Sequence, residues 1–95
     1  MKDKKYHFQI LNGRSVVIDQ ECTFAEIRRL GDTMATNQRQ RLKVQGFNEP
    51  RNGWDYLGIF LGNRQFQNWD GDRWQINSDY RGMTRMTARK EVSHV

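Results

Sequence analysis

A chain of 95 residues is expected to form one domain, and it has no apolar run near the ~20 residues that cross a membrane. One cysteine and no export signal predict a cytoplasmic protein without disulfides. The net charge of +5 sits in the two ends, since residues 6–80 hold equal numbers of basic and acidic side chains. This charge distribution excludes a strongly basic globular domain. We expect a basic tail at residues 1–5, a neutral domain at 6–77 and a basic arm at 78–95.

The first predicted element is a β-hairpin at residues 6–19, with Asn12-Gly13 as its two-residue turn. In that register Leu11 faces Arg14 and Phe8 faces Val17. Both faces of this ribbon are partly apolar, so we expect it to lie inside a larger sheet.

A helix is predicted at residues 23–45. It begins with a capping box, in which the Thr23 hydroxyl accepts from the Glu26 N–H and the Glu26 side chain reaches back. Apolar residues at helical spacing from Phe24 to Leu42 form its buried stripe. The pattern is weakest at residues 36–38, and a break there would leave Leu42-Lys43-Val44 as a strand.

A three-stranded meander is predicted at residues 54–77, with two-residue turns at Gly62-Asn63 and Asp70-Gly71. The following residues lack clear periodicity, apart from a short helix expected around Met83 and Met86. The fold class is therefore α+β: an antiparallel sheet in the order ββαβββ, with one long amphipathic helix packed across it. One face of the meander would gather Trp54, Tyr56, Phe60, Trp69, Trp74 and Ile76.

This aromatic face allows two interpretations. Exposed aromatic rings could stack on unpaired bases, as they do on RNA-binding sheets. We favour the alternative that the rings form the core, because a chain this short needs its large side chains for its own burial. Since a sheet has two faces and only one helix is predicted, one face is expected to stay partly open for a partner.

Basic residues of the helix and of the C-terminal arm are the other candidates for a binding surface. Such side chains could pair with phosphates and give salt-dependent affinity for nucleic acid, although a solvated helix face and a solvated tail are their ordinary roles. No recognised nucleic-acid motif accompanies them. The candidate partner-binding residues are Arg28, Arg29, Arg39, Lys43, Trp54, Trp69, Trp74, Arg81, Arg85, Arg89 and Lys90.

The sequence contains no nucleophile elbow, phosphate loop or dinucleotide-binding pattern, and we expect no enzyme, no cofactor and no metal site. Asp70-Gly71-Asp72 is interpreted as a turn, because the further oxygen ligands of a calcium loop are missing. Cys22 has acidic neighbours and is predicted to be an unreactive partner of Ile27 in a hydrophobic staple. A small ribonuclease of toxin type fits the length and pI, but no acid–base pair is visible.

The stretch from Lys4 to Ile10, Gly53-Trp54-Asp55-Tyr56 and the stretch from Trp69 to Trp74 resemble the small accessory proteins of tailed phages and prophages of enteric bacteria. The resemblance implies a compact protein that acts on host or phage machinery by binding. We expect a protein-binding module that uses an exposed sheet face, with nucleic-acid binding as the alternative. An exposed strand edge leaves dimerisation by sheet extension open.

Overall fold

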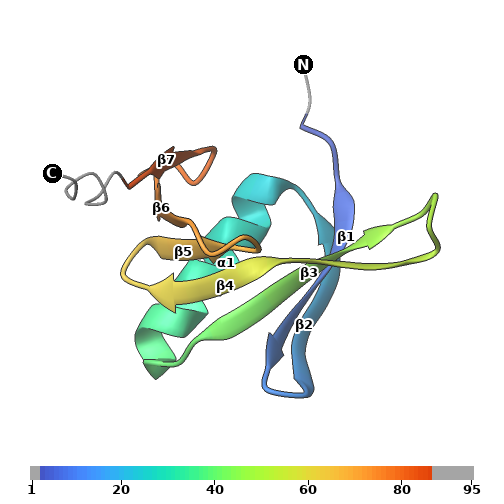
Figure 1. The fold of residues 1–95 in the computed structure, drawn as a ribbon, viewed down its shortest axis with the longest axis horizontal. Coiled ribbons are helices and arrows are strands. Elements are labelled where there is room, and N and C mark those ends of the chain that lie inside the picture. Colours follow the sequence, from blue (N-terminus) through green and yellow to red (C-terminus); the bar gives the residue numbers. More distant parts are fainter. Residues whose placement is uncertain (1–2, 87–95) are drawn as a thin grey trace, which may run out of the picture.

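The computed structural model of the chain describes residues 3–86. Within that range, seven antiparallel strands form one sheet in the order β2-β1-β3-β4-β5-β6-β7, and one helix lies across one face (Figure 1). The predicted α+β class, with an antiparallel sheet and a helix packed on it, is confirmed. The elements are β1 (Tyr6–Asn12), β2 (Ser15–Cys22), α1 (Phe24–Gln38), β3 (Leu42–Asn48), β4 (Gly53–Gly62), β5 (Gln65–Asn68), β6 (Arg73–Ile76) and β7 (Met83–Arg85).

The helix ends earlier than predicted, and the order of elements differs accordingly. It stops at Gln38, with Arg39 in the left-handed conformation at φ 54° as its C-cap, so residues 23–45 are not one helix. Leu42–Asn48 forms β3 between β1 and β4 instead. The order is therefore ββαβββββ rather than ββαβββ. Thr36 and Asn37 are weak helix formers, and the helix ends directly after them, at Gln38.

The start of α1 agrees with the sequence. The Thr23 hydroxyl accepts from the Glu26 N–H at 3.1 Å, and the Glu26 carboxylate accepts from the Thr23 N–H at 2.9 Å. Cys22 and Ile27, on either side of this capping box, are both buried. The hydrophobic staple fixes the angle at which the chain leaves β2 and enters the helix.

The three predicted hairpin registers are each displaced. In the first hairpin Asn12 faces Ser15 and Leu11 faces Val16, with Gly13 as the residue of positive φ, so the loop is Gly13-Arg14 rather than Asn12-Gly13. Between β4 and β5 the loop is Asn63-Arg64, both at positive φ. Between β5 and β6, Gln67 faces Arg73. A displacement of one residue moves every side chain to the other face, which redistributes the aromatic residues.

The core lies between α1 and the near face of the sheet. Ile27 and Ala35 of the helix are buried in one cluster with residues from six strands. Residues directly opposite in neighbouring strands share a face, so Phe66 and Trp74 point to the helix side together. The buried apolar sheet residues are Phe8, Ile10, Cys22, Leu42, Val44, Phe60, Phe66 and Ile76.

Part of the expected C-terminal arm forms a strand of the sheet. Met83–Arg85 pairs with β6 as β7, so the short helix expected around Met83 and Met86 is wrong. Residues 87–95 lie outside the described part of the chain. In the part described, α1 has neither the length nor the apolarity needed to cross a membrane.

Candidate functional site

The face of the sheet opposite α1 is covered by no other helix or strand of residues 3–86. We call it the open face. Side chains alternate along each strand, so the neighbours of buried core residues point to it. It carries His7, Gln9, Leu11, Val16, Asp19, Glu21, Lys43, Gln45, Phe47, Trp54, Tyr56, Ile59, Gln65, Gln67, Arg73, Gln75 and Thr84.

One end of the open face holds a cluster of aromatic rings. Trp54 packs edge-on against Phe47 and against His7, with ring centroids 5.2 and 5.1 Å apart. Tyr56 lies on the same strand as Trp54 and is 45% exposed. A bulge causes this arrangement: Val44 faces Gly58 whereas Gln45 faces Tyr56, so Leu57 is an extra residue and the strand changes face there.

Polar side chains next to the aromatic cluster form a network of hydrogen bonds with one another. Gln9 donates to Asp19 at 2.7 Å and accepts from Gln45 at 2.8 Å, and the His7 ring is hydrogen-bonded to the same Asp19 carboxylate. The bond to His7, followed by that to Gln9, lowers the pKa of Asp19. This network fixes side chains from β2, β1 and β3 in one geometry, which reduces the entropy that a binding partner must remove.

The open face is close to electrically neutral. Its cations are Lys43 and Arg73, and its anions are Asp19 and Glu21. Amide side chains and aromatic rings fill most of the space between them. A surface of this composition is typical of protein recognition, since few of its groups can neutralise phosphates.

A second surface lies around Phe24 at the start of α1 and reaches the edge of the open face, where His7, Glu21 and Phe47 also line it. Three adjoining hollows of about 280, 510 and 190 Å³ are all lined by Phe24, and we call them together the Phe24 groove. Tyr6 and Lys4 line the first two, and Leu57 lines the last two. The smallest hollow is mostly apolar, and Trp69, which is 66% exposed, stands at its edge.

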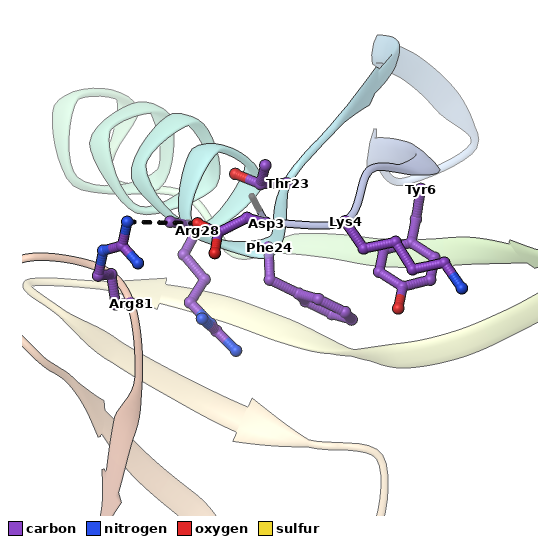
Figure 2. A pocket seen from close by; sticks show the side chains of 8 residues that line it. Asp3, Lys4, Tyr6, Thr23, Phe24, Arg28 and Arg81 are labelled. Atoms are coloured by element: carbon purple, nitrogen blue, oxygen red, sulfur yellow. Dashed lines mark ion pairs between the residues drawn. The ribbon is translucent and has the colours of Figure 1, made fainter. Parts of the chain in front are cut away.

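Figure 2 shows how the rings and cations meet in the first hollow of the groove. Tyr6 packs against Phe24 with centroids 5.2 Å apart, and Arg28 and Arg81 lie on the other side of Phe24. Burial lowers the pKa of Arg28, whose guanidinium donates to the Tyr80 carbonyl at 3.1 Å. Arg81 pairs with Asp3 at 3.3 Å.

The candidate binding residues from the sequence analysis lie on several separate parts of the structure. Arg28 and Arg81 line one hollow, Trp69 stands at the edge of another, and Arg29 is exposed on α1. Lys43 and Trp54 lie on the open face, and Arg39 caps the helix. Trp74 faces the helix side with a buried indole N–H, and Arg85 pairs with Asp72 at 2.9 Å. Arg89 and Lys90 lie outside the described residues.

The aromatic face predicted for the meander is wrong as a single surface. Trp54 and Tyr56 lie on the open face, whereas Phe60, Trp74 and Ile76 lie on the helix side, because the bulge at Leu57 divides the strand. Sequence reasoning also missed four ring-bearing residues that line the two surfaces, namely Tyr6, His7, Phe24 and Phe47. The exposure of Phe24 could have been expected, because side chains lean toward the N-terminus of a helix and Phe24 is the first residue of α1.

The structure also describes Cys22 and the acidic turn Asp70-Gly71-Asp72, which the sequence analysis considered for thiol and metal chemistry. Burial, the largest influence, raises the pKa of the Cys22 thiol, as expected for an unreactive residue. In the acidic turn, the Asp72 N–H donates to the Asp70 carboxylate at 3.1 Å. No three His, Cys, Asp or Glu side chains of residues 3–86 are grouped closely enough to hold a metal ion.

Comparison with protein-family models, with curated proteins and with solved structures finds no match to this chain.

Proposed function

We propose that this chain is a non-enzymatic binding module that holds a protein partner on the open face of its sheet. The supporting observation is the cluster of His7, Phe47, Trp54 and Tyr56 on a face that no described helix covers. Aromatic residues are enriched among the anchors that dominate binding energy, and here amide side chains surround them. The partner class that the sequence resemblance implies is a protein of the host or of a phage.

Charge favours a protein over a nucleic acid as the occupant of this face. The two cations and two anions of the open face leave little net attraction for a phosphate backbone. The cations that the sequence offered for that role are divided among α1, its C-cap, β3, β7 and the Phe24 groove. Those within residues 3–86 lie on separate elements and do not form one stripe along which a backbone could lie.

The test compares two exposed aromatic side chains on opposite sides of the molecule. A photo-crosslinking amino acid is placed at Tyr56 on the open face, or at Trp69 on the helix side as the matched control. The proposal predicts a stoichiometric protein adduct from position 56 and none from position 69. Adducts from position 69 alone, or nucleic acid from position 56, would contradict it.

Affinity for the captured partner then provides the second measurement. Tyr56→Ala is expected to weaken binding at least ~10-fold, since truncating an anchoring aromatic residue costs about 2 kcal/mol or more. Trp69→Ala should leave the affinity unchanged. Circular dichroism of both variants checks folding, which should be intact because both side chains are exposed.

The Phe24 groove favours nucleic acid as a second candidate function. Its first hollow combines the rings of Tyr6 and Phe24 with Lys4, Arg28 and Arg81 against one anion, Asp3, and single-stranded nucleic acid is bound by such mixtures of rings and cations. Binding of mixed-sequence single-stranded RNA and DNA, measured at two salt concentrations, tests it. Salt-sensitive binding that Arg81→Ala weakens would support this candidate, and absence of binding at low salt would exclude it.

A further inference from the structure

The outer edge of β2 is the longest unpaired strand edge in the described sheet. β2 has eight residues and pairs with β1 on one side alone, whereas the opposite edge strand, β7, has three residues. Natural edges are commonly protected by lysine, proline or short length, and β2 has none of these features. Its middle is apolar, with Val16 and Val17 exposed at 47% and 43%.

The two ends of this edge carry opposite charges that lack partners. Arg14 stands in the turn before β2 and Glu21 near its end, and neither makes an ion pair or a side-chain hydrogen bond within residues 3–86. The other acidic residue of β2, Asp19, is already held by His7 and Gln9. A strand with a free cation at one end and a free anion at the other is complementary to its own antiparallel copy.

We propose that two copies of this chain form a dimer by antiparallel pairing of β2 with β2, which extends the sheet across a twofold axis. Because Val17 is the extra residue of the bulge, the register places that axis at Ile18, which faces its own copy, so that Arg14 of each copy faces Glu21 of the other. The two Ile18 side chains then meet at the centre with Val17 beside them, and Val16 lies opposite Asp19. Moving the register by two residues would pair Arg14 with Asp19, which has partners already, and would leave Glu21 alone.

The bulge in β2 is compatible with this pairing. Ile10 faces Ile18 whereas Leu11 faces Val16, so Val17 is the extra residue and has no partner on β1. A bulge commonly blunts an edge by turning it away or by presenting a charge. Here it exposes an apolar side chain beside the twofold axis, where contact with the second copy would bury it.

The experiment measures the mass of the full chain in solution by light scattering or sedimentation, over concentrations up to about 1 mM. The wild-type chain is expected to be a dimer. Arg14→Glu places two like-charged pairs across the axis, and so does Glu21→Arg, because each contact occurs twice. Each single variant is expected to raise the dimer dissociation constant at least ~10-fold.

Mixing the two variants gives the decisive measurement. A chain with Glu at 14 and 21 faces a chain with Arg at both positions, so both contacts regain opposite charges and a 1:1 heterodimer is expected. Arg29→Glu, an exposed change on α1, is the control that should leave the dimer unaltered. A monomeric wild-type chain, single variants that dimerise as well as the wild type, or a mixture without heterodimer would overturn the proposal.

Discussion

The carboxylate of Asp32 accepts a hydrogen bond from the backbone N–H of Arg64 at 2.8 Å, which ties the middle of α1 to the turn between β4 and β5. Asp32 is 4% exposed, and the hydroxyls of Thr36 and Tyr80 lie 3.5 and 3.4 Å from it. The Arg64 guanidinium in turn stands 4.7 Å from the centre of the Tyr80 ring. One buried acidic side chain therefore joins the helix, a hairpin turn and the loop before β7.

Removing this carboxylate should destabilise the fold. Asp32→Ala leaves the Arg64 N–H without its acceptor, and a buried donor left unpaired costs about 1–3 kcal/mol. The free energy of unfolding, measured by urea denaturation, should fall by that amount. Asp32→Asn keeps an oxygen acceptor and should lose less, and Thr33→Ala, at an exposed position of α1, should change little. Equal losses for Asp32→Ala and Thr33→Ala would contradict the role of the carboxylate.

Gly31 of α1 packs directly against the ring of Phe60 on β4. A Cβ atom at Gly31 would lie within 2.7 Å of Cζ of Phe60 and closer still to other atoms of that ring, which is 1% exposed. Gly31→Ala should therefore destabilise the protein by about 1–3 kcal/mol through overpacking, although alanine is the better helix former. Combining it with Phe60→Leu, which removes ring atoms, should restore part of the loss. Thermal or urea unfolding of the two variants measures this, and a stabilised Gly31→Ala variant would refute the contact.

The capping box of α1 should make stability depend on pH in the acidic range. The hydrogen bond from the Thr23 N–H, its largest influence, lowers the pKa of Glu26 below the ordinary value of 4.5. The contribution of the carboxylate is therefore complete above the unfolded-state pKa and is lost as the pH falls through the lower folded-state value. The stability difference between wild type and Glu26→Ala should shrink between pH 6 and about pH 3.

Glu26→Gln is the matched control for this pH dependence. Glutamine keeps an acceptor for the Thr23 N–H but does not titrate. The difference in unfolding free energy between Glu26→Gln and Glu26→Ala should therefore stay constant over the same range. A wild-type difference that is equally constant would show that the carboxylate charge adds nothing to the cap.

Local signals predicted the elements well and their registers poorly. The capping box located the start of α1 because Thr23 and Glu26 act on their own neighbourhood. Turn residues located each hairpin, but glycine in Asn12-Gly13 and Gly62-Asn63 is compatible with more than one loop position. The bulge at Val17 has no local sequence signature, whereas the irregularities at Leu57 and Leu61 each lie next to a strand glycine, Gly58 or Gly62, which is the local signal for a bulge. Because side chains change face with each displaced residue, the open face could not be assembled from sequence alone.

Asp32 shows a second limit of sequence reasoning. Helical spacing alone puts Asp32 beside Arg28, Arg29 and Thr36, opposite the apolar stripe of the helix, on a face that is ordinarily solvated. The partners that bury it, Arg64 and Tyr80, come from positions 32 and 48 residues further along the chain. Nothing near Asp32 in the sequence indicates such partners.

The order of strands in the sheet has a consequence for how the chain reaches its fold. From β3 to β7, each strand pairs with the next along the chain, and β1 pairs with β2 in the same way. The pairing of β1 with β3 is the one described case that must wait for residues distant in sequence, because β2 and α1 lie between them. Chains rich in such short-range pairings close small loops first and fold fast. The rate-limiting event should then be the docking of two preformed ribbons along β1 and β3, with the helix as their connection.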